Sequence, residues 1–252
     1  MSIEPLDMEK ARSEINRAYL SQLPQITWWR RFVRWLTVWL ARICVKLFIQ
    51  LDVKGLENVP PEGPALIVSN HLGDADFVIG IALAPRQIET VGKIELSDLP
   101  VLGKFLDLYG MIWVNRGQPD RQAIKSVLQA FKEGRVVAIA PEGRESLTGS
   151  LEEGTAGAAY LALKGKVLLV PVTYTGTENM QVFSNMKRLQ RSNVTVTIGQ
   201  AFYLEEKSNW REAVRKGTEQ IMLTLARQLP PTYQGVYRET IERSDERSKF
   251  EF

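Results

Sequence analysis

The sequence predicts an α/β fold in which a mixed, largely parallel sheet is covered by helices. Short apolar runs, typical of buried strands, recur along the chain. Between them lie longer segments with apolar residues on one helical face, many ended by Gly or Pro. Alternating strands and helices favour parallel strands, because each crossover places a helix on a sheet face. The 252 residues suffice for one such domain with a peripheral piece.

We expect the chain to divide into an N-terminal helical membrane-association segment (1–49), the α/β domain (50–232) and a C-terminal tail (233–252). Residues 6–20 are predicted to form a short polar helix or to be disordered. A connector is expected at 52–63, because it contains two prolines and two glycines. The tail after Tyr237 has few apolar anchors and is expected to fray.

Within the domain, the strands are expected at residues 65–68, 88–91, 111–114, 136–140, 167–173 and 194–198. The helices are expected at 75–84, 97–109, 120–133, 155–164 and 209–229. Ser97 is the expected N-cap of the second helix, Pro119 or Asp120 opens the third, and Gly165 stops the fourth.

The N-terminal segment at residues 27–50 is predicted to be an amphipathic helix at a membrane interface. It holds four of the six tryptophans and five basic residues, and it contains no acidic residue. Its charge-free stretch, 35–41, is far shorter than the ~20 residues that span a bilayer. One face collects Trp29, Phe32, Leu36, Trp39, Leu40, Ile43 and Leu47; the other carries Arg30, Arg31, Arg34 and Arg42, expected near anionic headgroups.

The alternative is a helix packed on the domain with its arginines solvated. The two interpretations are compatible, because one side of the helix could dock while the other contacts lipid.

Composition excludes several classes of function. The net charge of +3 is too mild to indicate nucleic-acid binding. Cys44 is the only cysteine, so no disulfide framework is possible, and with one histidine a transition-metal site is not expected. The single cysteine fits a reducing compartment. The polar N-terminus does not read as a signal peptide, and GxSxG, GxGxxG and phosphate-binding loop motifs are absent from the sequence.

The stretch IVSNHLGDAD, residues 67–76, contains the only histidine, His71. It lies in a predicted strand-to-helix turn, a frequent place for chemistry in α/β sheets. Asp76 follows five residues later and could fix the tautomer of the ring, so that the second ring nitrogen takes a proton from a hydroxyl. A lone histidine in a turn more often has a structural role. Asp74 is interpreted as an acidic residue that is favoured at the start of a helix by the helix dipole.

Polar residues recur at three predicted strand ends. The first strand end gives Asn70, His71 and Asp76, the second gives Asn115 and Arg116, and the third gives Glu142, Gly143 and Arg144. The carboxyl ends of parallel strands meet at one edge of a sheet. Two arginines there would suit a phosphate, and the glycine would admit close approach of a ligand. Taken singly, each residue has an ordinary surface interpretation; their recurrence favours a site.

These blocks resemble the glycerolipid acyltransferases, the family of 1-acylglycerol-3-phosphate acyltransferase. NHLGDAD (70–76) is similar to the family's NHxxxxD block, and MIWVNRG (111–117) to its second block. PEGRES (141–146) resembles the third, usually PEGTRS, and LLVPVTYTG (168–176) the fourth. Lys93, Glu95, Pro100 and Gly103 also fall where the family often has such residues. The resemblance covers about residues 50–200.

The resemblance implies transfer of a fatty acyl group from an acyl thioester to a lysophospholipid hydroxyl, most simply 1-acyl-sn-glycerol-3-phosphate, giving phosphatidic acid. His71 would be the general base and Asp76 its partner. Arg116 would bind the acceptor phosphate, while Glu142 and Gly143 would shape the acceptor site. Asn70, Lys93 and Arg144 complete the expected substrate-binding set.

The resemblance also implies acyl-CoA or acyl–acyl carrier protein as co-substrate, no cofactor and no metal. It implies a peripheral or monotopic place on the cytoplasmic face of a membrane, with the phospholipid surface as partner. Arg144-Glu145 depart from the usual Thr-Arg, which leaves the acceptor headgroup open. The alternatives are another glycerolipid acceptor, a non-catalytic lipid-binding protein, or a thioester or lipid hydrolase with water as acceptor.

Overall fold

The protein is described by a computed structural model covering residues 20–115, 120–206 and 208–249. The predicted polar helix at 6–20 therefore lies, except for its last residue, outside the described part. The strands are β1 (Ile49–Lys54), β2 (Ala65–Ser69), β3 (Ile88–Lys93), β4 (Ile112–Val114), β5 (Val136–Ile139), β6 (Leu168–Thr175) and β7 (Ser192–Ile198).

These seven strands form one sheet in the order β1-β7-β6-β2-β5-β3-β4. Every neighbouring pair is parallel except β6 and β7. The predicted mixed, largely parallel sheet is thus confirmed. β2 lies between β5 and β6, so the turn after β2 is flanked by the carboxyl ends of both neighbours.

The helices are α2 (Trp28–Phe48), α3 (Ala75–Leu83), α4 (Leu102–Tyr109), α5 (Arg121–Lys132), α6 (Gly157–Gly165), α7 (Asn179–Lys187), α8 (Trp210–Gln228) and α9 (Arg238–Lys249). Four 3-10 turns, η1 (Leu56–Asn58), η2 (Ile94–Asp98), η3 (Pro231–Tyr233) and η4 (Gly235–Tyr237), complete the described elements. Asp120 caps α5 by accepting from Gln122 N–H and Ala123 N–H.

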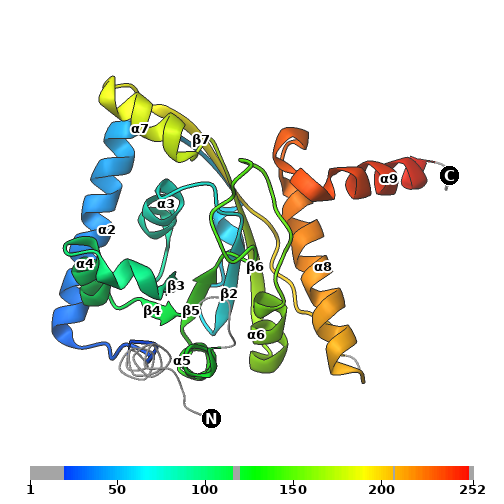
Figure 1. The fold of residues 1–252 in the computed structure, drawn as a ribbon, viewed down its shortest axis with the longest axis horizontal. Helices are drawn as coiled ribbons and strands as arrows, with labels where there is room; N and C mark the ends of the chain where they lie inside the picture. Colours follow the sequence, from blue (N-terminus) through cyan, green and yellow to red (C-terminus); the bar gives the residue numbers. More distant parts are fainter. Residues whose placement is uncertain (1–19, 116–119, 207, 250–252) are drawn as a thin grey trace, which may run out of the picture.

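Three local predictions are wrong. Ser97 does not cap α4 but lies within η2, where its hydroxyl donates to the carbonyl of Ile94. The expected connector begins inside β1, which pairs in parallel with β7. The chain after Tyr237 does not fray up to residue 249, because it forms α9, with Ile241 buried in the main core. Figure 1 shows α9 extending away from the body beyond α8.

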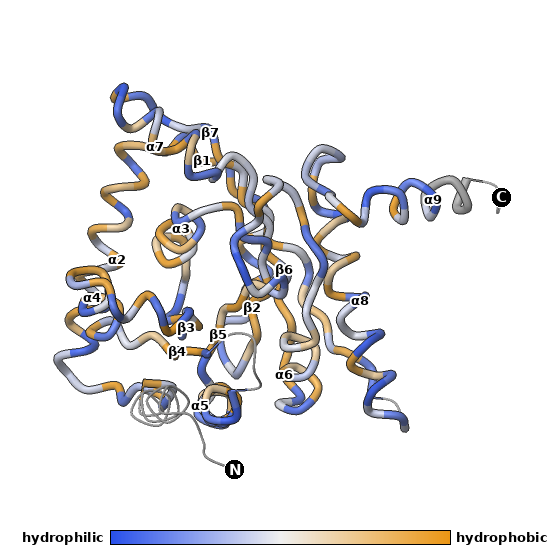
Figure 2. Tube along the Cα trace, in the orientation of Figure 1, coloured by the Kyte–Doolittle hydropathy of each residue, from blue (hydrophilic) through white to orange (hydrophobic). Residues whose placement is uncertain are grey.

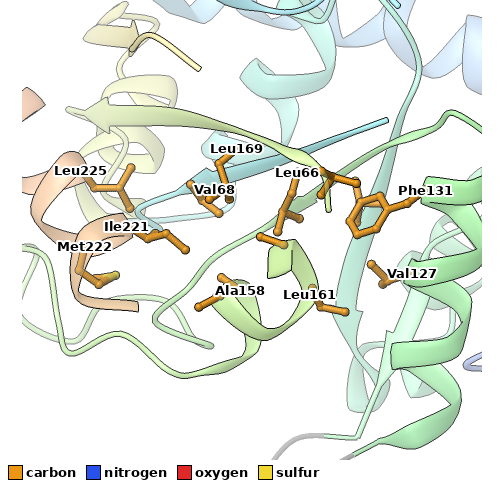
Figure 3. Close-up of a cluster of buried hydrophobic side chains, with 14 of the residues drawn as sticks. Leu66, Val68, Val127, Phe131, Ala158, Leu161, Leu169, Ile221, Met222 and Leu225 are labelled. Carbon is orange, nitrogen blue, oxygen red and sulfur yellow. The ribbon is translucent and has the colours of Figure 1, made fainter. Parts of the chain in front are cut away.

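Helices cover both faces of the sheet (Figure 1). Along β2, Leu66 and Val68 face a core built with α5, α6 and α8, whereas Ala65 and Ile67 face a second core built with α3 and α7. Figure 3 shows the first core around Leu66 and Val68. Figure 2 shows hydrophobic residues along β2 and β5, as expected for strands that are covered on both faces. The central strands are therefore rigid supports for the turns at their carboxyl ends.

Helix α2 docks with its arginine side on the protein, which corrects the expectation of arginines near lipid headgroups. Arg34 is 1% exposed and donates two hydrogen bonds, of 2.9 and 2.6 Å, to the carboxylate of Glu89 in β3. Its Nε donates to the carbonyl of Tyr109 at 2.8 Å. Arg30 and Arg42 donate to backbone carbonyls at α4 and α3. These hydrogen bonds hold α2 beside α3 and α4 (Figure 1).

The opposite side of α2, which we call the aromatic face, is open to solvent. It consists of Trp28, Trp29, Phe32, Trp35, Trp39, Leu40, Ile43 and Leu47, all exposed. A contiguous apolar surface of this kind typically marks an interaction site. Within the described ranges, no helix combines the length and apolarity needed to cross a membrane.

Candidate active site

The turn after β2 brings His71 to the carboxyl edge of the sheet. It continues through Gly73 into α3, whose first turn carries Asp76. A Cβ at position 73 would lie 2.5 Å from the carbonyl oxygen of Thr177, so only glycine allows this close passage beside the end of β6. The packing of β2 between β5 and β6 thus positions the histidine.

His71 and Asp76 form the pair that their spacing predicts. Nδ1 of His71 lies 2.9 Å from Oδ2 of Asp76, which also accepts from the N–H groups of Leu72 and Gly73 at 2.8 and 3.1 Å. Because the carboxylate accepts at Nδ1, the neutral ring carries its proton there and leaves Nε2 as the acceptor. The histidine side chain is 29% exposed and the aspartate 6%. A buried acid therefore orients a base that an external hydroxyl can reach.

The carboxylates around the ring make His71 a stronger base. Burial alone lowers the pKa of His71, but the hydrogen bond to Asp76 and the charges of Asp76, Glu145 and Asp74 outweigh it, so the pKa is raised. The imidazolium formed after proton uptake is stabilised by the same charges.

Glu142 holds the backbone of the histidine. Its Oε1 accepts from the N–H of His71 at 3.2 Å, and its Oε2 accepts from the N–H of Glu152 at 2.7 Å. Burial raises the pKa of Glu142 to about 7, although both backbone bonds favour the charged form. Both carboxylate oxygens of Glu142 thus accept from backbone N–H groups, so this side chain supports the turn that carries His71.

Gly143 and Arg144 follow in the same loop. Gly143 has a φ of +77°, a left-handed conformation that favours glycine. Its N–H donates to the carbonyl of Ala140, so this group is already engaged. Arg144 donates from Nε and Nη2 to one carboxylate oxygen of Glu152, at 2.8 and 2.6 Å, and its side chain is 57% exposed. Its cation is therefore partly neutralised at the surface.

Asn70 has a structural position. It is 1% exposed, and its amide both donates to the carbonyl and accepts from the N–H of Tyr174, at 2.9 and 2.8 Å. These bonds continue the pairing of β2 with β6 beyond the strand end.

Lys93 ends β3, and its partly exposed side chain forms no hydrogen bond or ion pair with any described residue. Its strand position is opposite Val114, two residues before Arg116 in the sequence. Arg116 itself lies outside the described residues.

Two site residues were absent from the predicted set. Glu145 accepts from Nδ2 of Asn179 at 2.9 Å, and Oδ1 of Asn179 accepts from the N–H of Asp74 at 2.9 Å. This link ties the loop after β5 to the first turn of α3. Asn179 follows β6, so asking which polar residues end that strand would have found it. Among the described residues no cluster of His, Cys, Asp and Glu is arranged to hold a metal.

Comparison with known proteins identifies relatives. A family model described as Acyltransferase matches residues 50–175. The chain is 29% identical over 172 residues to the chloroplastic 1-acyl-sn-glycerol-3-phosphate acyltransferase of Arabidopsis thaliana, covering 67% of this chain and 48% of that protein. It is 34% identical over 128 residues to the 1-acyl-sn-glycerol-3-phosphate acyltransferase of Bacillus subtilis, covering 50% and 63%.

The chain thus spans about half the length of the Arabidopsis relative. Among solved structures, the 1-acyl-sn-glycerophosphate acyltransferase of Thermotoga maritima superposes with a TM-score of 0.62 at 19% identity, covering 79% of this chain and 80% of that one. The likeness shows the same fold. With the family model matching half of its residues, the chain belongs to the acyltransferase family.

Proposed function

We propose that this protein transfers a fatty acyl group from an acyl thioester to the hydroxyl of 1-acyl-sn-glycerol-3-phosphate, forming phosphatidic acid. The observation that carries the proposal is the His71–Asp76 pair, with Nδ1 bound at 2.9 Å and the ring 29% exposed. The names of the relatives indicate the acceptor.

The chemistry needs one base and no enzyme nucleophile. Nε2 of His71 takes the proton from the acceptor hydroxyl while the hydroxyl oxygen forms a bond to the carbonyl carbon of the thioester. The tetrahedral intermediate then collapses, the carbon–sulfur bond breaks, and the thiolate takes the proton from the imidazolium. Asp76 and Glu145 stabilise that imidazolium by their charge. General-base catalysis of this kind contributes about 10²–10⁴ in rate.

Lys93 and Arg116 are the proposed phosphate-binding residues. The ammonium group of Lys93 has no partner among the described residues, and the backbone pairing of Lys93 with Val114 sets it beside β4, after which Arg116 follows in the sequence. Arg144 is a weaker candidate, because Glu152 already pairs with it. Asn70, Glu142 and Gly143 would act by shaping the turn and loop beside the acceptor.

The aromatic face of α2 is the proposed contact with the phospholipid surface, at the cytoplasmic face of a membrane. Tryptophans are favoured at the membrane–water interface. Arg31 and Lys46 remain exposed on this helix and could meet anionic headgroups. Because the other arginines dock on the domain, the helix would lie on the membrane as a fixed part of the enzyme, which holds the active site near its lipid acceptor.

The direct test is acyl transfer from radiolabelled acyl-CoA, and in parallel from acyl–acyl carrier protein, to lysophosphatidic acid in detergent micelles. We expect label in phosphatidic acid, and none in diacylglycerol when monoacylglycerol replaces the acceptor. Label only in free fatty acid would identify a hydrolase. Lipid binding without consumption of thioester would identify a binding protein; either result contradicts the proposal.

A matched pair of variants tests the phosphate site. Lys93→Ala should raise KM for lysophosphatidic acid about tenfold or more, because a hydrogen bond to a charged group is worth about 1.5–3 kcal/mol. Lys132→Ala, at an exposed position on α5, is the control and should leave KM unchanged.

A further inference from the structure

The segment after α8 is attached to the loop that carries Glu142. Leu151, 1% exposed, donates its N–H to the carbonyl of Tyr233 at 2.9 Å and accepts from the N–H of Val236 at 3.2 Å. Gly235 has a φ of +54°, and a Cβ there would lie 1.8 Å from the carbonyl oxygen of Leu151. Only glycine permits this contact. We call residues 231–237, which include η3 and η4, the C-terminal clasp.

Two side chains extend the clasp. The hydroxyl of Tyr233 donates at 2.7 Å to Oε1 of Glu178, the N-cap residue of α7, and Oε2 of Glu178 is buried without a partner among the described residues. Burial and the Glu178 carboxylate raise the pKa of Tyr233 to about 12, so the phenol stays protonated and able to donate. The hydroxyl of Tyr237 accepts from the N–H of Gly154 at 3.1 Å. The clasp therefore binds the loop between β5 and α6 at two points, Leu151 and Gly154, and the start of α7 at a third.

A continuous path leads from the clasp to the base. Glu152, next to Leu151, donates its N–H to Glu142, and Glu142 accepts from the N–H of His71. The carbonyl of His71 accepts from the N–H of Ser146 in the same loop at 2.7 Å. Both backbone polar groups of the histidine are thus held by this loop, and the loop is held by the clasp.

We propose that the C-terminal clasp is a positioning element of the active site, which holds the loop between β5 and α6 so that His71 faces the acceptor. The proposal rests on the proposed function, since the base it positions is the one assigned there. The clasp lies outside residues 50–175, which the family model matches. Tyr233 is its positioning residue toward the start of α7, and Gly235 allows the close contact with Leu151.

The test compares Tyr233→Phe with Tyr203→Phe in the full chain. The first variant removes the donor to Glu178 and keeps the ring; the second removes a phenol that is 63% exposed and is the control. We expect Tyr233→Phe to lower kcat between about tenfold and a hundredfold, because small displacements of a catalytic group have effects of that size, with KM for both substrates unchanged. Tyr203→Phe should match the parent protein.

Amide hydrogen exchange gives a readout that does not depend on the reaction. The N–H groups of His71 and Glu152 should exchange faster in Tyr233→Phe and at the parental rate in Tyr203→Phe. Unchanged exchange, or an unchanged kcat in a protein that does transfer acyl groups, would overturn the proposal. If the parent shows no transfer to lysophosphatidic acid, the proposed function fails and the exchange result alone decides the role of the clasp. Gly235→Ala should also show faster exchange of these two N–H groups. If the Gly235→Ala protein does not fold, the test is decided by Tyr233→Phe, which changes only one hydroxyl.

Discussion

Replacing Arg34 by methionine should destabilise the protein, because it leaves a buried acid short of its main partner. Glu89 is 2% exposed and receives two hydrogen bonds from Arg34 and a third, longer one of 3.3 Å from Arg135. Methionine has a similar length but donates nothing. Tyr109 also loses the donor to its carbonyl.

Breaking a buried ion pair from one side costs about 3–5 kcal/mol, and the remaining contact with Arg135 favours the lower end, about 3 kcal/mol. For a chain of this size, 1 kcal/mol corresponds to about 2–4 °C, so Tm should fall by roughly 6–12 °C. Urea and thermal unfolding followed by circular dichroism measure both quantities. Arg31→Met, at an exposed position of the same helix, is the control and should change the free energy of unfolding by less than about 0.5 kcal/mol.

A double-mutant cycle separates the ion pair from other effects. When Glu89→Gln is combined with Arg34→Met, the joint cost should be smaller than the sum of the single costs by more than about 1 kcal/mol, since the buried charge is then gone. A loss below about 1 kcal/mol in Arg34→Met alone, or additive costs in the cycle, would refute the view that the arginine side of α2 anchors this helix.

The remaining predictions concern catalysis and lipid. Asp76→Asn should lower kcat/KM by at least about a hundredfold, because the imidazolium of His71 loses its nearest charge; a smaller effect would argue against the pair. Glu145→Gln should move the acid limb of the pH–rate profile to lower pH, because Glu145 helps raise the pKa of His71 and the base must be neutral to act; superimposable profiles would contradict this. Trp39→Ser should weaken sedimentation with anionic vesicles about tenfold or more, whereas Trp210→Ser on α8 should not, and equal binding by both variants would exclude the aromatic face as the lipid contact.

Local patterns predicted the centre of the fold and of the candidate site well. His71, in the turn after β2, and Asp76, in the first turn of α3, are five residues apart, so local structure alone brings the two side chains together. The same holds for Asp120, which caps the helix that directly follows it. The largely parallel sheet followed from alternating elements, which need no knowledge of distant contacts.

Contacts between residues far apart in the chain could not be predicted from local sequence patterns. The helical wheel grouped the arginines of α2 correctly, but their orientation depends on Glu89, 55 residues beyond Arg34. Asn70 was predicted to bind substrate from its place at a strand end, since its bonds to Tyr174, 104 residues away, could not be foreseen from local sequence. β1 did carry a readable signal, since Ile49–Lys54 alternates apolar and polar residues, but the helical pattern that runs into it concealed the change of period.

The most direct test of the account is the rate of acyl transfer to lysophosphatidic acid by the parent protein and by His71→Ala, with binding of the acceptor measured in both. His71 is partly exposed and its ring bonds only to Asp76 among the described residues, so the variant should fold and bind lipid as the parent does. We predict that kcat falls by about 10²–10⁴ while acceptor binding is unchanged. Equal rates of phosphatidic acid formation by the two proteins would contradict the assignment of His71 as the general base.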